Sequence, residues 1–213
     1  SGEEPQWSIN EYLHDIDPDR WSGTIVESAN KIVADAFAIK NIIPNVSSAI
    51  FKNPGPLEIL EDLQWKKMQT CGDWVFYLHL LCGGVLAYSP DACNYYRIHG
   101  KNTSVKSYSG DTYYAEHETV AKTVQRYYRV NREIFGRQRL NLIAHWRESR
   151  SSFSEEAFEK TYSLSRIDDA ATERAPNLLM ASYGFCSGGG ETFPVELANL
   201  MKGSDYNITY LDC

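Results

Sequence analysis

Apolar residues recur at intervals of three to four positions along most of the chain, the spacing that places them on one face of an α-helix. This periodicity predicts helices over residues 27–40, 57–68, 73–81, 110–135, 139–150, 166–175 and 194–202, and a further helix that starts at Ser154. Short runs rich in β-branched and aromatic residues predict strands over 46–51, 85–88, 93–98, 177–185 and 207–211. The pattern therefore predicts an α+β fold that is mostly helical.

The character of the chain changes at Pro176. A buried strand, a glycine turn, a helix and a second strand follow in order, which predicts one β–loop–α–β unit of Rossmann type. Gly188, Gly189 and Gly190 let backbone approach a ligand at the helix N-terminus, although their spacing does not meet the GxGxxG fingerprint of dinucleotide sites. Since one such unit cannot form a parallel sheet with both faces covered, we expect the chain to be truncated there.

Composition narrows the class of protein. The 213 residues are 43% hydrophobic and 13% aromatic, enough to bury a sizeable core, and the net charge of −7 argues against general nucleic-acid binding. The 5 cysteines contain no CxxC pair, which favours reduced thiols in a cytoplasmic protein. No apolar run approaches the roughly 18 residues of a membrane span, whereas peripheral association with the inner face of a membrane is compatible with the composition.

The tripeptide Gly72-Asp73-Trp74 stands where the helical pattern of 73–81 begins. An aspartate at a helix start commonly caps the helix, and it can also serve as a general base that removes a proton from an attacking hydroxyl. The two roles are compatible, because a capping carboxylate leaves one oxygen free. Trp74 is either a core residue or a platform for a sugar ring.

A second group of polar residues follows the predicted strand 93–98. His99 comes first, and the polar loop 100–104 after it can close over a diphosphate, with Arg97 and Lys101 supplying positive charge. A lone histidine is more often structural than a ligand. Asn45 and Ser47 lie at a predicted strand end that could meet a ligand.

The sequence His14-Asp15-Ile16-Asp17 contains the Asp-x-Asp pattern by which nucleotide-sugar enzymes hold a divalent metal. In those enzymes the pattern ends a buried strand. Here no apolar strand precedes it and Pro18 follows at once, which favours a solvated turn.

Three segments in this order resemble the C-terminal half of an inverting family-2 glycosyltransferase of the GT-A fold. They are NVSSAIF at 45–51, GDW at 72–74 and NYYRIHG at 94–100, and the likeness covers residues about 10 to 105. The tail from Pro176, with GGGE at 188–191, resembles the start of a family-4 glycosyltransferase of the GT-B fold. Multidomain bacterial enzymes that build surface polysaccharide combine such modules in tandem.

The resemblance implies transfer of a sugar from a nucleotide-sugar donor to a glycan or lipid-linked glycan, with inversion at the anomeric carbon. It implies that Asp73 is the base, and the acceptor side is expected to include Trp74, Asn45 and Ser47. His99 would bind the metal or the diphosphate. Arg97 and Lys101 would bind the donor diphosphate, and Gly188, Gly189, Gly190 and Glu191 would form the glycine loop of the second module. The divalent cation, Mn²⁺ or Mg²⁺, would be held mainly by a donor-binding half that lies upstream.

We therefore expect three parts: residues 1–105 as the acceptor side of the GT-A domain, 106–175 as a helical connector, and 176–213 as the truncated start of the GT-B domain. We expect the chain to be a fragment of a larger enzyme and to have the rest of that polypeptide as its partner. By itself it is expected to be inactive or nearly so.

Two other functions are open. The helical stretch 108–175 carries no catalytic pattern, which fits a non-catalytic interaction or connector domain. A nucleotide-dependent enzyme centred on Gly188 to Gly190 is less favoured, because that loop lacks the Lys-Ser/Thr of a P-loop.

Overall fold

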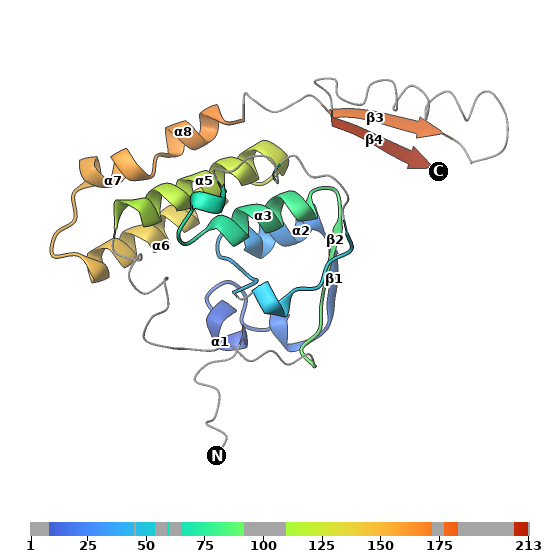
Figure 1. The fold of residues 1–213 in the computed structure, drawn as a ribbon, viewed down its shortest axis with the longest axis horizontal. Coiled ribbons are helices and arrows are strands. Elements are labelled where there is room, and N and C mark those ends of the chain that lie inside the picture. Colours follow the sequence, from blue (N-terminus) through green and yellow to red (C-terminus); the bar gives the residue numbers. More distant parts are fainter. Residues whose placement is uncertain are drawn as a thin grey trace, which may run out of the picture. The chain divides into compact units, whose positions relative to one another are not determined.

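The computed structural model describes residues 9–44, 46–53, 59, 65–91, 110–171, 177–182 and 207–212 (Figure 1). The chain divides into two compact units, residues 1–172 and 173–213. The first unit is mostly helical with a small antiparallel sheet of two strands, so the coarse prediction of an α+β fold is confirmed.

The first unit begins with helix α1 (Ile9–Leu13) and strand β1 (Ile25–Ser28), followed directly by helix α2 (Ala29–Ile32). The Ser28 side chain caps α2 by accepting a hydrogen bond of 3.4 Å from the Lys31 N–H. A π-helical segment, Val33–Phe37, continues α2, and the N–H of Ala38 donates to the Val33 carbonyl across five residues. The predicted helix over 27–40 is therefore shorter, because its first two residues pair in the sheet.

Strand β1 pairs antiparallel with strand β2 (Val85–Tyr88), in a register that sets Ile25 opposite Tyr88 and Ser28 opposite Val85. The predicted strand 85–88 is confirmed. Gly83, with φ 72°, turns the chain into β2 through a left-handed conformation that glycine adopts without steric cost.

Helix α3 (Gly72–Leu81) follows a 3₁₀ turn at Trp65–Lys67, which lies in the predicted helix 57–68. The helix predicted over 73–81 is confirmed. The predicted strand 46–51 is wrong: Val46–Ser48 forms a 3₁₀ turn, closed by the Ala49 N–H on the Val46 carbonyl. Among the described residues no strand pairs with this segment, so its β-branched composition has no sheet to join.

Among the described residues, four helices follow β2 in the first unit: α5 (Asp111–Tyr127), α6 (Glu133–Ser149), α7 (Glu155–Thr161) and α8 (Leu164–Asp169). Helix α5 packs against α3 and against α7 and α8 (Figure 1). No helix in the described ranges is both long and apolar enough to cross a bilayer.

The break in the predicted helix 110–135 falls before Gly136, which lies inside α6. Tyr128 is extended, with φ −124° and ψ 153°, and its hydroxyl donates to the Leu78 carbonyl of α3. The Asn131 side chain then accepts from the Glu133 N–H at 3.0 Å, at the start of α6. A tertiary contact and a local cap therefore place the break, rather than the glycine.

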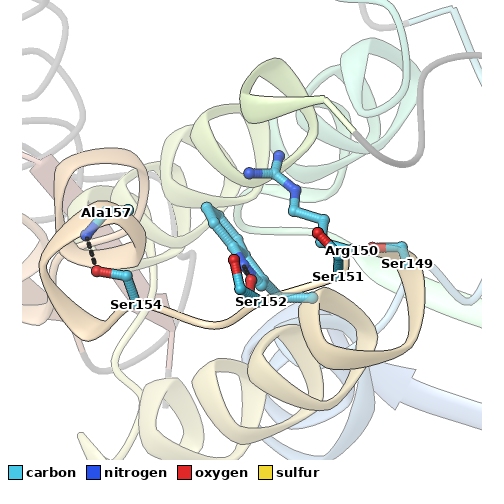
Figure 2. Close-up of a pocket in the computed structure, with 7 residues that line it drawn as sticks. Ser149, Arg150, Ser151, Ser152, Ser154 and Ala157 are labelled. Carbon is cyan, nitrogen blue, oxygen red and sulfur yellow. Dashed lines mark hydrogen bonds between the residues drawn. The ribbon is translucent and has the colours of Figure 1, made fainter.

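Helix α7 starts as predicted, since Ser154 Oγ accepts a hydrogen bond of 3.3 Å from the Ala157 N–H (Figure 2). The helix predicted over 166–175 has the wrong bounds. Helix α8 begins two residues earlier, at Leu164, and ends at Asp169.

One hydrophobic core runs through the first unit. It joins Leu13, Trp21 and Phe37 to Leu78 of α3 and then to α5 and α8, where Ile167 is fully buried. The helices expected as a connector therefore share a core with the residues before them, while the three-part division of the chain stays a prediction.

The second unit contains strands β3 (Asn177–Ser182) and β4 (Asn207–Asp212), as the sequence predicts. They pair in parallel, with Asn177 opposite Asn207 and Ser182 opposite Asp212. Parallel neighbours need a crossover connection, the topology of the predicted β–loop–α–β unit. The predicted glycine loop and helix lie outside the described residues.

Candidate functional site

Asp73 lies in the first turn of α3, one residue after the helix begins. Its Oδ1 accepts a hydrogen bond of 2.7 Å from the Trp74 N–H, and the Asn41 side chain also hydrogen-bonds to the carboxylate. Asn41 Oδ1 accepts from the Ile43 N–H at 3.0 Å, so the Asn41 amide nitrogen faces Asp73 as the donor. Two elements distant in sequence thus orient one half-buried carboxylate.

Burial raises the pKa of Asp73, and the hydrogen bonds from Trp74 and Asn41 offset that effect only in part. The carboxylate is therefore more basic than an exposed aspartate. A held carboxylate of raised pKa is what general-base catalysis requires.

A pocket of about 280 Å³ opens beside Asp73. Its lining residues come from the 3₁₀ turn, the loop that leads into α3 and the first two residues of α3: Trp65, Lys66, Met68, Gln69, Thr70, Gly72 and Asp73. The ring of Trp65 is half-exposed and stacks on Phe76, with 5.4 Å between ring centroids. The pocket therefore combines a carboxylate, a cation and an aromatic ring.

Gly72 allows this turn to fold against the helix. A Cβ at this position would lie 2.6 Å from the Trp65 carbonyl oxygen, a distance that a side chain cannot occupy. The glycine of the Gly72-Asp73-Trp74 sequence is therefore required by the close approach of backbone that forms the pocket wall.

Glu116 of α5 holds the loop from the other side. Its carboxylate accepts hydrogen bonds from the backbone N–H groups of Gln69 (2.6 Å), Thr70 (2.8 Å) and Cys71 (3.0 Å), and from the Thr70 hydroxyl (2.6 Å). Burial alone would raise the pKa of Glu116, but these bonds outweigh it and lower the pKa. Glu116 is only 6% exposed and is thus a buried anion satisfied by the loop.

Trp74 does not line this pocket and is 3% exposed. Its indole Nε1 donates to the Phe37 carbonyl, and its ring stacks on Phe37 and meets the edge of His117. In this structure the ring packs in the core. Ser47 lies on the exposed turn Val46–Ser48.

The other predicted site residues lie outside the described residues. These are Asn45, Arg97, His99, Lys101, Gly188, Gly189, Gly190 and Glu191. Their expected roles stay predictions.

Within the described ranges no group of three or more His, Cys, Asp or Glu side chains is placed to hold a metal ion. In the His14 to Asp17 sequence, Asp17 Oδ1 accepts from the N–H groups of Asp19 and Arg20, both at 3.2 Å. Asp15 pairs with Lys40 at 3.1 Å. Asp17 therefore stabilises a local turn, while Asp15 joins this segment to a lysine 25 positions further along the chain.

A larger pocket of about 490 Å³ lies where α6 leads into α7 (Figure 2). Its lining consists of Trp146, Ser149, Arg150, Ser151, Ser152, Ser154 and Ala157. Arg150 stacks over the Trp146 ring at 3.6 Å and pairs with Asp111 at 2.8 Å, so its charge is used within the fold. No acid or base lines this pocket beyond that arginine, and the Asp73 pocket is the better candidate for chemistry.

Asn41, Thr70 and Glu116 are the site residues that sequence reasoning misses. Asn41 reads as the end of a helix, Thr70 as a loop residue and Glu116 as an exposed helix position. No local pattern distinguishes them, because their partners lie 32 to 47 positions away.

The chain matches no protein-family model, and no curated protein and no solved structure is significantly similar to it.

Proposed function

We propose that the first unit is the acceptor side of an inverting glycosyltransferase and that Asp73 is its general base. The observation that carries this proposal is the Asp73 carboxylate in the wall of the pocket, with its pKa raised by burial and its orientation set by Asn41 and the Trp74 N–H. The resemblance of the three sequence segments to family-2 glycosyltransferases supports the same assignment.

In the proposed reaction an acceptor hydroxyl donates a hydrogen bond to Asp73. As the hydroxyl oxygen forms a bond to the anomeric carbon of the donor, its proton passes to the Asp73 carboxylate. The bond from the anomeric carbon to the nucleotide diphosphate breaks on the opposite face, and the diphosphate leaves with the electron pair. The configuration of the sugar is therefore inverted.

The pocket suits a sugar acceptor. Trp65 offers a half-exposed ring for the apolar face of a pyranose, and Lys66 and Gln69 offer donors to its hydroxyls. We assign the donor diphosphate to Arg97 and Lys101, and a role in binding the divalent cation to His99, as the resemblance implies. A lipid-linked glycan acceptor would bring the chain to the membrane surface.

The alternative is a non-catalytic interaction or connector domain. The four helices α5 to α8 are built around buried aromatic residues and pair with one another through ion pairs, which suits a structural module. In that case Asp73 serves only the start of α3.

The test measures acceptor binding and turnover separately. A ¹⁵N-labelled chain is titrated with cellotriose, maltotriose and chitotriose, and we expect amide shifts at Gln69, Thr70 and Gly72. Nucleotide diphosphate release from UDP-glucose and UDP-N-acetylglucosamine is then followed with Mn²⁺, in this chain and in a longer polypeptide that contains it.

The variant Asp73→Asn should keep oligosaccharide binding and lose at least about 100-fold in turnover, the usual contribution of a general base. The matched control is Asp91→Asn, an exposed aspartate after β2 that lies outside the pocket. Absence of shifts at the pocket with all three oligosaccharides, or measurable turnover that is equal in the two variants, would favour the interaction domain.

A further inference from the structure

Helix α5 carries two buried glutamates on different sides. Glu116 and Glu118 are each 6% exposed. Glu118 pairs with Arg166 at 2.5 Å and accepts from the Ser163 N–H at 2.7 Å, so it binds α8. Glu116 binds the loop that leads into α3. Only Glu116 therefore touches the candidate site.

We infer that Glu116 is a positioning residue for Asp73: by gathering the N–H groups of residues 69–71 on one carboxylate, it sets where α3 begins and where the Asp73 carboxylate lies. A catalytic consequence of this positioning rests on the function proposed above. The positioning itself rests on the hydrogen bonds of Glu116 alone.

The same residues belong to both features. Gln69 and Thr70 line the pocket, and their N–H groups are bound to Glu116. The next bound N–H, that of Cys71, comes two residues before Asp73. A displacement of Glu116 is therefore transmitted to the pocket wall and to Asp73 through at most two peptide units.

Residues 69–71 lie outside the described helices and strands, so these donors belong to no helical or sheet ladder. Without the carboxylate, three N–H groups would lose a charge-assisted acceptor, the strong class of hydrogen bond. On the other side, the Trp65 carbonyl lies so close to Gly72 that a Cβ at this position would be only 2.6 Å from it. The loop is thus held between α5 and the 3₁₀ turn.

The helices after residue 110 thus have a role in the candidate site. Sequence reasoning treats 106–175 as a connector between two modules. Through Glu116, α5 instead supplies a part without which the Asp73 site is incomplete.

The test compares Glu116→Gln with Glu118→Gln, two substitutions of equal chemistry and equal burial on the same helix. The first readout is hydrogen exchange at the amides of residues 69–71. We expect Glu116→Gln to lower protection there by at least about 10-fold, since a glutamine has one acceptor oxygen and a mismatched NH₂ group. Glu118→Gln should leave these amides unchanged and loosen Ser163.

The second readout is the ¹³C carboxyl titration of Asp73. Release of the loop exposes Asp73 to water, so we expect its titration midpoint to fall toward the ordinary value in Glu116→Gln and to stay in place in Glu118→Gln. Equal exchange and equal titration in the two variants would overturn the inference.

If Glu116→Gln does not fold, Thr70→Val removes the 2.6 Å hydroxyl bond to Glu116 and a weaker 3.5 Å contact with Cys71 Sγ, with little change of shape. Its control is Thr119→Val, which removes an exposed hydroxyl bond to the Ala115 carbonyl of α5. We expect the same direction of change at Asp73 in Thr70→Val alone, and an unchanged Asp73 titration there would overturn the inference.

Neither readout needs a ligand or turnover. A shifted Asp73 titration together with no turnover effect of Asp73→Asn would keep the positioning role and discard the glycosyltransferase. If the Asp73 titration is unshifted in Glu116→Gln while Asp73→Asn loses turnover, the glycosyltransferase proposal is kept and the positioning role of Glu116 is discarded.

Discussion

The indole Nε1 of Trp74 donates a hydrogen bond of 2.9 Å to the backbone carbonyl of Phe37, and the two aromatic rings stack with 6.1 Å between their centroids. Phe37 ends the π-helical segment, where the last carbonyls of a helix have no partner within it. A side chain from α3 thus satisfies a buried carbonyl at the end of another helix, and Trp74 joins the two elements by polar and apolar contacts at once.

Replacement Trp74→Phe should lower the free energy of unfolding by about 2–4 kcal/mol, because it leaves the Phe37 carbonyl buried without a donor and opens a cavity. Urea unfolding measures this. The comparison is Trp65→Phe, at the half-exposed ring of the pocket, which should affect oligosaccharide binding more than Trp74→Phe does. A stable Trp74→Phe variant with impaired binding would return Trp74 to the acceptor site.

Asp73→Asn should raise stability at neutral pH. The folded-state pKa of Asp73 lies above its unfolded value, so the unfolded chain loses this proton first as pH rises. Stability is therefore lost from the unfolded pKa of about 4 upward through the folded pKa, and asparagine avoids that loss. We expect a gain of about 0.5–1 kcal/mol at pH 7 that vanishes near pH 3.

Thermal unfolding at the two pH values tests the prediction, with Asp91→Asn as the exposed control. A loss of stability at pH 7 would show that the carboxylate serves α3 rather than a reaction.

Acid should destabilise the first unit through His117. Burial lowers the pKa of His117 to about 4, while its Nδ1 lies 2.8 Å from the Tyr113 carbonyl and 3.5 Å from Cys71 Sγ. As pH falls, the unfolded chain takes up the proton near 6.5 and the folded chain only near 4, so stability is lost between these values, by roughly 2–3 kcal/mol.

Urea unfolding at pH 7.5, 5.5 and 4.5 should show this slope, and His117→Gln should flatten it because the variant cannot titrate there. The NMR titration of the His117 ring gives a direct reading. A midpoint above 6 would contradict the prediction.

The ion pair between Glu118 and Arg166 should matter more for stability than a surface pair. Arg166 Nε and Nη2 bind the two carboxylate oxygens as a fork, and the Glu118 side chain is 8% exposed. Glu118→Ala is expected to cost about 2–3 kcal/mol, since the Ser163 N–H also loses its acceptor.

The control for this pair is Lys160→Ala, at an exposed contact with Glu156 of the same helix, which should change stability by less than about 0.5 kcal/mol. Arg166→Lys should fall between the two, because lysine keeps the charge and loses the fork. Equal costs for Glu118→Ala and Lys160→Ala would contradict the prediction.

Elements whose cause is local could be predicted from the sequence. Helix α3 follows from an apolar run closed by Gly83 and Gly84, and the start of α7 follows from the Ser154 cap. Strands β2 and β4 follow from short runs that contain β-branched residues, and β3 follows from the apolar run Leu178-Leu179-Met180 after Pro176. For the two helices the signal comes from neighbours within a few positions, whereas each strand takes its hydrogen bonds from a partner strand that is distant in the sequence.

Elements that depend on contacts with distant parts of the chain could not be predicted from the sequence. The break between α5 and α6 depends on the contact of Tyr128 with Leu78, 50 positions away. The segment 46–51 has strand composition, yet a strand needs a partner that the pattern cannot supply.

By itself the sequence determined the candidate base, because Asp73 stands at the start of a helix between a glycine and a tryptophan. Only the tertiary structure decided its surroundings. In the fold Trp74 is buried and donates to the Phe37 carbonyl, and Asn41 hydrogen-bonds to the Asp73 carboxylate. Glu116 accepts hydrogen bonds from the loop that leads into α3. The physical reason is that a buried polar group must find a partner wherever the fold brings one, and that partner leaves no trace in the local periodicity.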